Sequence, residues 1–346
     1  MDDIKLTRFS HGGGCGCKIA PSVLQTLLAS APPGLMPADL LVGTEHADDA
    51  AVYRINDHQA IVATTDFFTP IVDDPYDFGR IAATNALSDV YAMGATPIMA
   101  LAVVGMPLDK LPAEVIGRIL AGGAAVCRDA GIPIAGGHSI DVLEPIYGLV
   151  GLGLVDPAQV KTNAGARAGD VLLLTKPLGV GILSAALKKG RLDADGYAEM
   201  VRWTTLLNRV GAQLAADDAV HAVTDVTGFG LAGHLLEMCR ASHLQAQLPF
   251  ASIPLIARAE ALARDAVATG ASARNWTSYG DEVHLPDGFT DWQRTLLTDP
   301  QTSGGLLVAC APEAVARVSA CVREVQGNDA SVIGHLQDGT PGVWVA

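Results

Sequence analysis

Residues 77–105 read DFGRIAATNALSDVYAMGATPIMALAVVG, a helical pattern that leads directly into a buried strand. Ile81, Leu87 and Tyr91 form the packing face of this helix, and Gly94 is a suitable residue to end it. The run Ile98–Gly105 is apolar throughout, which favours a buried strand. The stretch therefore predicts a helix over 77–94 followed by a strand over 98–105.

The alternation of strand and helix continues outward from this stretch. The sequence predicts helices at Pro21–Ser30 and Pro112–Gly131, and strands at Ala50–Ile55, Ala60–Thr65, Ile132–Ala135 and Ile146–Val155. Such an order is typical of an α/β or α+β unit.

A polar, turn-rich stretch over Asp156–Gly169 is interpreted as a domain linker. Beyond it we expect strands at Val171–Thr175, Ala219–Asp225, Ala246–Phe250, Leu306–Ala311, 332–336 and 343–346, with helices at 180–189, 195–216, Leu231–Ser242, Ile256–Thr269 and Pro312–Val325. The two halves are similar in length, and each has a Thr-Asp pair at a strand end, Thr65-Asp66 and Thr224-Asp225. This similarity hints at an ancient duplication.

Length and composition indicate a globular enzyme. The 346 residues fit two domains of about 150–170 residues each, and an apolar share of 49% argues against disorder. A net charge of −14 without a basic stripe argues against nucleic acid or an anionic membrane as a partner. The longest apolar stretches, such as Ile98–Met106, are half a membrane span, the N-terminus lacks a signal-peptide pattern, and six scattered cysteines show no disulfide framework. We therefore expect a cytoplasmic protein.

The segment HGGGCGCK at residues 11–18 combines four glycines with two thiols and a cation. Glycine admits backbone conformations closed to other residues, so the segment is able to fold over a ligand or to stay mobile. Lys18, close to Cys15 and Cys17, favours the thiolate form of a cysteine.

Three plainer interpretations of that segment compete. It can be a disordered terminus. It can be a zinc site made by His11, Cys15 and Cys17, although structural zinc sites usually have four ligands and wider cysteine spacing. A phosphate-binding P-loop is excluded, because Ile19 follows Lys18 where that motif needs a hydroxyl for the metal.

Aspartates next to small residues at strand or helix ends form a second group. Asp48 and Asp49 precede a predicted strand, Asp66 ends another, and Asp225 lies where a strand enters a glycine turn. Asp89 lies inside an apolar helix, where an ionised side chain is costly unless it is paired or metal-bound. Each one alone can be a turn former or a helix cap. Together they fit Mg²⁺ shared with the phosphates of ATP.

The run Ala135–Ser139 reads AGGHS, and its backbone N–H groups are able to cradle phosphate if the two glycines form a turn. His138 by itself is more often a capped or core histidine than a catalyst.

These motifs resemble those of the selenophosphate synthetases, or selenide, water dikinases. The matching stretches are Ser10–Lys18, Asp48–Val52, Thr64–Phe68, Ala82–Asp89, Ala135–Asp141, Thr224–Gly230 and Asp299–Gly305. They cover essentially the whole chain in the same order. The Cys-Gly-Cys-Lys segment separates the chain from relatives with the same ATP-binding fold, such as aminoimidazole ribonucleotide synthetase and thiamine-monophosphate kinase.

The resemblance implies a two-domain, aminoimidazole ribonucleotide synthetase-like α+β fold with α/β-type layers. It implies a flexible glycine-rich catalytic arm over 1–20, an ATP-binding and dimerisation domain over 21–156, and a C-terminal α/β domain over 170–346. A homodimer with a β-barrel between the first domains is expected. The implied reaction forms selenophosphate from selenide, ATP and water, and releases AMP and orthophosphate. The reaction requires Mg²⁺, and a monovalent cation can be a further cofactor.

The resemblance also assigns roles by position. Cys15 is the selenium-handling residue and Lys18 the second catalytic residue, whereas Cys17 is not expected to be essential. The expected Mg²⁺ ligands are Asp49, Asp89 and Asp225. The expected ATP-binding residues are Lys18, His46, Ala47, Asp48, Asp66, Asp89, Gly137, His138 and Ser139, and Gly137–Ser139 reach the ATP site of the partner subunit. The assignment of His46 rests on its place in the sequence and not on its residue type.

Three other functions stay open on the sequence. A different kinase or ligase of the same fold, acting on a small nucleotide or vitamin precursor, explains the aspartates but leaves the thiol segment without a role. A redox or metal-binding module explains the thiols but not the ATP-directed motifs. A non-catalytic scaffold explains neither the thiols nor Asp89.

Overall fold

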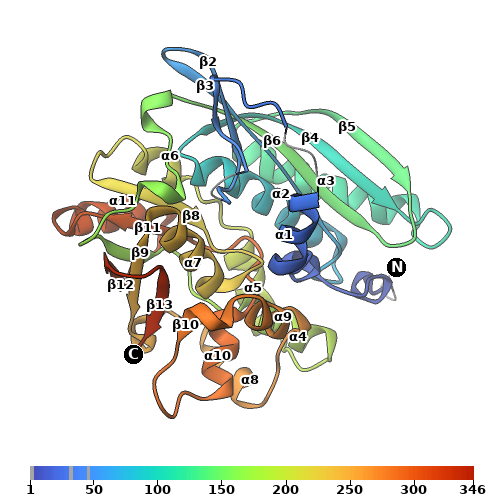
Figure 1. Cartoon of the computed structure of the whole chain (residues 1–346). Coiled ribbons are helices and arrows are strands. Elements are labelled where there is room, and N and C mark those ends of the chain that lie inside the picture. The colour runs from blue at the N-terminus through green and yellow to red at the C-terminus, as the bar shows by residue number, and fades with distance from the viewer. Residues whose placement is uncertain (1–3, 31–33, 45–46) are drawn as a thin grey trace.

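The computed structural model describes residues 4–30, 34–44 and 47–346, which form two sheets with helices packed against them (Figure 1). The first sheet has the strand order β1-β2-β3-β6-β4-β5. Its strands are β1 (Leu40–Val42), β2 (Ala51–Asn56), β3 (Gln59–Phe68), β4 (Thr96–Met106), β5 (Ile134–Asp141) and β6 (Ile146–Val155). Pairing is antiparallel except between β4 and β5, which run parallel.

Two helices, α2 (Pro75–Ala92) and α3 (Ala113–Asp129), cover one face of this sheet. The α2 helix begins after Asp74, whose side chain accepts a hydrogen bond from the Asp77 N–H, and Pro75 occupies its first turn. The two helices approach closely because Gly79 has no side chain: a Cβ atom there would overlap the Ile119 carbonyl oxygen. The predicted helix and strand over 77–105 are therefore confirmed, with slightly shifted ends.

The second sheet has the order β10-β13-β9-β12-β7-β11-β8. Its strands are β7 (Val171–Leu174), β8 (Val220–Asp225), β9 (Leu244–Leu248), β10 (Val283–His284), β11 (Leu306–Cys310), β12 (Ser331–Asp338) and β13 (Gly342–Val345). The helices of this half are α4 (Val180–Lys188), α5 (Ala194–Thr204), α6 (Val210–Leu214), α7 (Gly230–Ser242), α8 (Ala257–Arg264), α9 (Gly270–Tyr279), α10 (Asp291–Thr298) and α11 (Val315–Gln326). Apolar side chains of α7 pack on the strands from one side, and those of α11 and α6 pack from the other.

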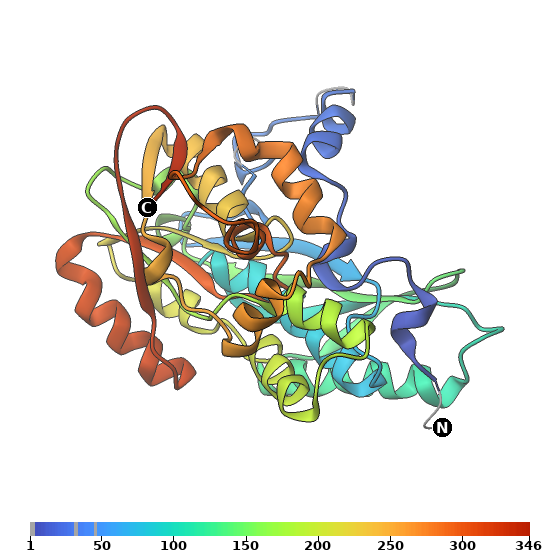
Figure 2. The same ribbon diagram turned by 90° about the horizontal axis from the view of Figure 1, so that it is seen from below.

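The N-terminal segment consists of two short 3-10 helices, η1 (Leu6–Phe9) and η2 (Gly14–Cys17), followed by α1 (Pro21–Ser30). Five further 3-10 turns are η3 (Pro157–Gln159), η4 (Asn163–Gly165), η5 (Phe250–Ser252), η6 (Gly280–Glu282) and η7 (Pro312–Ala314). Figure 2 shows the N-terminal segment passing beside the helices of the second half, where η2 and α1 both contact α9. The flexibility expected of residues 1–20, and the boundaries 21–156 and 170–346, stay predictions.

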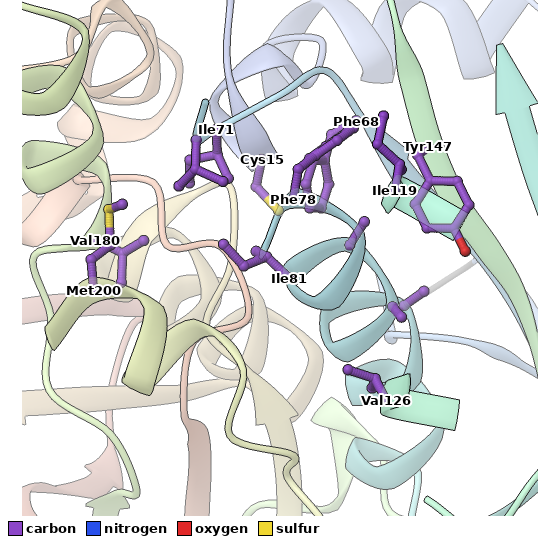
Figure 3. Packing of buried hydrophobic residues seen from close by; sticks show 14 of the residues in the cluster. Cys15, Phe68, Ile71, Phe78, Ile81, Ile119, Val126, Tyr147, Val180 and Met200 are labelled. Atoms are coloured by element: carbon purple, nitrogen blue, oxygen red, sulfur yellow. The ribbon is translucent and has the colours of Figure 1, made fainter. Parts of the chain in front are cut away.

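One large apolar cluster joins the two halves. It includes residues of α2 and α3 together with α4, α5 and the N-terminal segment. Figure 3 shows Cys15 near Ile71, Phe78 and Ile81, while Val180 and Met200 belong to the second half. Burial of Cys15 in this cluster fixes the segment around it against the core.

Several predicted elements differ from the observed ones. The helix predicted over Ile256–Thr269 ends at Arg264, as α8. The helix predicted over 195–216 is divided into α5 and α6, because Asn208 between them bonds to Ser88 Oγ and to the Gly304 carbonyl instead of continuing a helix. The strand predicted to end at Ala135 continues to Asp141. Gly136 and Gly137 therefore lie in the strand, with Gly137 opposite Ala102 of β4 and Gly136 at an irregularity of the pairing, and the turn predicted at these glycines is wrong.

In the described part of the chain, no helix is long and apolar enough to cross a bilayer.

Candidate active site

Four aspartates from separate elements meet between the two halves. Asp66 lies in β3, Asp89 in α2 and Asp225 at the end of β8, and all three are buried. Asp49, just before β2, is half-buried and accepts a hydrogen bond from Thr224 Oγ1 at 2.9 Å. We refer to Asp49, Asp66, Asp89 and Asp225 as the carboxylate cluster.

The cluster holds more negative charge than its surroundings neutralise. Burial is the largest cause that raises the pKa of Asp49, Asp89 and Asp225 above the ordinary carboxyl value. Repulsion by Asp225 is the next cause for both Asp49 and Asp89. One oxygen of Asp225, Oδ2, is buried without a hydrogen-bond partner among the described residues. Such a site is stabilised by a bound cation.

Lys18 supplies positive charge at the edge of the cluster. Its Nζ lies 3.2 Å from Asp66 Oδ2. Burial lowers the pKa of Lys18, but the neighbouring acidic groups, Asp66 foremost, together outweigh burial and raise that pKa above its ordinary value. Lys18 is therefore an ammonium ion over the whole physiological range.

Cys15 is buried beside Lys18, with 1% of its surface exposed. Its N–H donates to Thr302 Oγ1 at 3.0 Å, and its Sγ donates to Asn85 Oδ1 at 3.2 Å. Burial raises the pKa of Cys15 well above its ordinary value, and the opposing effect of Lys18 is smaller. The thiolate expected from the sequence is therefore wrong for this position of the segment: desolvation outweighs the nearby cation.

Asn85 connects the thiol to the carboxylates, and sequence reasoning missed this role. Its Nδ2 donates to Asp66 Oδ2 at 2.7 Å, while its Oδ1 accepts from Cys15 Sγ and from the Ser303 N–H. The one available signal was an amide side chain inside an otherwise apolar helix.

A loop in the second half supports the same thiol. Ser303 has a positive φ of 52°, and its carbonyl accepts from Lys176 Nζ at 2.9 Å. Lys176 also donates to the Leu206 carbonyl, and burial lowers its pKa to about 7. The neighbouring Thr302 binds the Cys15 N–H, so the loop Asp299–Gly305 holds the N-terminal segment in place.

The remaining predicted ATP-binding residues lie outside the carboxylate cluster. Asp48 accepts from the Asn163 N–H at 2.7 Å, and Asn163 also bonds to the Ala47 carbonyl, so both predicted residues contact the connection between the two halves. His46 lies outside the described residues. Gly137, His138 and Ser139 lie on β5, which is separated from β3 by β6 and β4, or about 14 Å across the sheet.

The zinc site considered for the N-terminal segment is not formed. His11 Nδ1 lies 3.0 Å from Glu144, whereas the Cys15 thiol bonds to Asn85. Within residues 4–30, 34–44 and 47–346, no group of three or more His, Cys, Asp or Glu is arranged to hold a metal ion. The carboxylate cluster is therefore not a complete ion cage either, and an ion there needs further ligands.

Comparisons with known proteins identify the family of the chain. Residues 47–155 match the N-terminal domain of the AIR synthase related proteins, and residues 167–345 match the C-terminal domain. Selenide, water dikinase of Burkholderia orbicola (strain MC0-3) is 66% identical over 343 residues, which are 99% of this chain and 97% of that protein. Selenide, water dikinase of Pseudomonas straminea is 63% identical, covering 99% of this chain and 96% of that protein. The chain belongs to the selenide, water dikinase family.

Solved structures of low sequence identity share the fold of this chain over most of its length. Thiamine-monophosphate kinase from Stenotrophomonas maltophilia K279a has a TM-score of 0.66 at 22% identity, covering 89% of this chain and 91% of that one. Hydrogenase maturation protein HypE in complex with ATP has a TM-score of 0.60 at 20% identity, covering 100% of this chain and 90% of that one. The predicted two-domain, aminoimidazole ribonucleotide synthetase-like fold is confirmed.

Proposed function

We propose that the chain forms selenophosphate from selenide, ATP and water, and releases AMP and orthophosphate. The observation that carries this proposal is the meeting of Cys15 and Lys18 with the carboxylate cluster. Family members named selenide, water dikinase at 59–66% identity support it over nearly the full length. The buried thiol has no role in a kinase that acts only on a nucleotide or vitamin precursor.

We propose Asp49, Asp89 and Asp225 as the residues that hold Mg²⁺. Their donor atoms are all carboxylate oxygens, the type Mg²⁺ prefers, and the unpartnered Asp225 Oδ2 is available to it. Phosphate oxygens of ATP and water would complete the shell, which agrees with the incomplete cage of the protein alone. A bound Mg²⁺ neutralises phosphate charge during phosphoryl transfer. A monovalent cation stays a prediction.

The side chains of this chain position the nucleotide and the thiol. Lys18, always charged, binds phosphate next to Asp66, and His46, Ala47 and Asp48 are proposed to contact the nucleotide from the start of β2. Asn85 Oδ1 holds the Cys15 thiol in place by accepting a hydrogen bond from it. The packed N-terminal segment excludes water from the sulfur, which protects a reactive phosphoryl or selenium group from hydrolysis.

We propose that a second copy of the chain binds the open face of the first sheet, so that Gly137–Ser139 reach its ATP site. The strand β5 is exposed along most of its length at the edge of this sheet. The exposed apolar side chains of the sheet include Tyr53, Ile55, Phe67, Ile98 and Ile140. An apolar face of this kind marks an interaction surface. The β-barrel between the two copies and a cytoplasmic location stay predictions.

Nucleotide analysis of the reaction tests the proposal. With selenide and Mg²⁺ we expect ATP to give AMP, and we expect Cys15→Ser to abolish this turnover. Cys321→Ser is the matched control, because Cys321 is a half-buried thiol on α11 in the second half. Formation of ADP at one rate with and without selenide would indicate the alternative kinase function instead.

A further inference from the structure

A cavity of about 630 Å³ lies between the N-terminal segment, the end of α4 and the start of α9. Cys17 and Lys18 line it from the segment, Lys188 and Lys189 from α4, and Arg274 from α9. No member of the carboxylate cluster lines it. The cavity is therefore a separate space that meets the candidate active site only at Lys18.

The cavity is positively charged, although the chain as a whole carries a net charge of −14. Lys188, Lys189 and Arg274 contribute cationic groups from two different helices, and none of the described residues that line the cavity is acidic. The first residues of α9, Gly270 and Ala271, also line it, so the positive end of a ten-residue helix faces the same space. This combination selects an anionic ligand.

Two of these cations donate hydrogen bonds to neutral carbonyl groups, although Lys188 also interacts with the charge of Glu144, which does not line the cavity. Lys188 Nζ donates to the Ser10 carbonyl at 3.0 Å, and Arg274 donates to the Gly16 carbonyl at 2.9 Å. The side-chain ammonium of Lys189 has no hydrogen-bond or ion-pair partner in the described part of the chain. Hydrogen bonds to an anion are stronger than those to a carbonyl, so a ligand that carries negative charge would engage all three cations.

The volume of the cavity suits an organic ligand rather than free selenide alone. Cavities of 300–1,000 Å³ typically accommodate organic ligands, whereas hydroselenide has a single heavy atom. Ile19, Val23 and Ile71 provide apolar wall for an organic part. Cys17, half-buried at the same wall, is a thiol for which the proposed reaction has no use.

We propose that this cavity binds selenium carried by an anionic low-molecular-weight thiol, as a perselenide R–S–Se⁻ whose R group bears carboxylates, and that Cys17 takes the selenium from it. This proposal rests on the proposed function, because it names the form in which selenium reaches the same reaction. The carboxylates of R bind Lys188, Lys189 and Arg274, and the selenium end points to the thiol.

The transfer is an exchange without net oxidation or reduction. The Cys17 sulfur attacks selenium, so a bond forms between the Cys17 sulfur and selenium while the bond between selenium and the carrier sulfur breaks. The carrier leaves with the electron pair of that bond and takes up the proton of the Cys17 thiol. R–S–Se⁻ and the Cys17 thiol thus give R–SH and a Cys17 perselenide. A further R–SH then attacks the Cys17 sulfur, forms a mixed disulfide with it and releases selenium as HSe⁻. A second R–SH restores the Cys17 thiol and gives R–S–S–R, so the carrier thiol is the two-electron reductant.

Calorimetric titration of the full chain with reduced glutathione, a tripeptide thiol with two carboxylates, tests the binding step. We expect saturable binding that weakens with salt and falls about tenfold or more in Lys189→Glu. The charge-matched control is Arg323→Glu on α11, which does not line the cavity and should bind as the wild type does. Absence of saturable binding, equal binding by Lys189→Glu, or binding of inorganic phosphate without glutathione would overturn the proposal.

A kinetic comparison separates this proposal from the proposed function. Selenium is supplied either as free hydroselenide or as the glutathione perselenide, with the same excess of reduced glutathione as reductant in both assays. We expect Lys189→Glu and Cys17→Ser to lower kcat/KM for the perselenide about tenfold more than for hydroselenide. Equal losses with both sources would overturn the cavity assignment and leave the function intact. Failure of the wild type to form selenophosphate from hydroselenide would overturn the function, while the calorimetric result would still decide binding.

Discussion

At the residue scale, the buried charges of the carboxylate cluster reduce stability in the absence of a cation. Asp225 is 1% exposed, and its raised pKa means that the folded state holds its proton more tightly than the unfolded state does. Stability therefore falls as pH rises above the ordinary carboxyl range toward that raised pKa. At neutral pH repulsion between the buried carboxylates destabilises the folded state, and a bound divalent cation removes this repulsion.

The substitution Asp225→Asn tests this. Without Mg²⁺ at pH 8 we expect the free energy of unfolding to rise by about 1 kcal/mol, or a Tm increase of about 2–4 °C, because repulsion is removed. Mg²⁺ should raise the Tm of the wild type at pH 8 more than at pH 5, and should have little effect on Asp225→Asn. Differential scanning calorimetry measures the Tm of both proteins under each of these conditions. Asp287→Asn, at an exposed position, is the control. A rise in Tm with Mg²⁺ that is equal in Asp225→Asn and Asp287→Asn would contradict a role of Asp225 in binding the cation.

Asn85 is the second residue whose role is open to a direct test. Asn85→Ala removes hydrogen bonds to Cys15, Asp66 and Ser303 and should cost about 2–4 kcal/mol of stability. Because the thiol loses its support, alkylation of Cys15 followed by mass spectrometry should become faster. Asn328→Ala deletes a comparable bond to the Thr175 carbonyl away from the thiol. Unchanged Cys15 alkylation in Asn85→Ala would show that Asn85 does not hold the segment.

The sequence indicated which residue types form the candidate site, but it did not indicate which residues they contact. Buried aspartates beside small residues indicated a cation site, and Asp89 was unusual in its helix. The bonds that join Asn85 to Cys15 and to Ser303 span 70 and 218 residues, so no local pattern contains them. The pKa of Cys15 was misjudged for the same reason: burial by distant residues, not the neighbouring Lys18, decides it.

At the scale of elements, the position of the N-terminal segment depends on one glycine. Gly14 has a φ of +55°, its N–H donates to the Thr69 carbonyl at 2.9 Å, and a Cβ atom there would overlap Thr302 Oγ1. Only glycine fits this turn without displacing the segment.

Gly14→Ala should therefore displace η2 from the core. We expect selenide-dependent AMP formation to fall at least about tenfold, because a misplacement of about 1 Å near reacting groups has such effects. Cys15 should also become open to alkylation. Gly117→Ala, in α3 where an added Cβ meets nothing within 4 Å, should keep both properties of the wild type. Normal activity and protection of Cys15 in Gly14→Ala would contradict the proposed role of η2.

Element types were predicted better than element ends. The strands β4, β6 and β11 were found because their apolar runs are long, and α2 was found because its large apolar residues recur at helical spacing. The helices α9 and α10 were missed, although Thr290 and Gln293 form a capping box at the start of α10 that was readable. The break between α5 and α6 depends on the tertiary contacts of Asn208, which periodicity does not record.

At the scale of the whole molecule, the open face of the first sheet is the proposed contact with a second copy. Ile140→Asp places a charge on β5, where Ile140 is 52% exposed, and should dissociate a dimer by leaving that charge without a partner. Sedimentation velocity measures the assembly. Val332→Asp, at a position 48% exposed on β12 of the second sheet, should not dissociate it. A wild type that stays monomeric at micromolar concentration would contradict the contact.

The central claim is that the two halves and the N-terminal segment together assemble a selenide-dependent kinase. Phosphorus NMR of the products from ATP, Mg²⁺ and selenide under anaerobic conditions tests this most directly. We expect a phosphorus signal coupled to selenium, together with AMP and orthophosphate. Conversion of ATP to ADP alone, without a selenium-coupled signal, would contradict it.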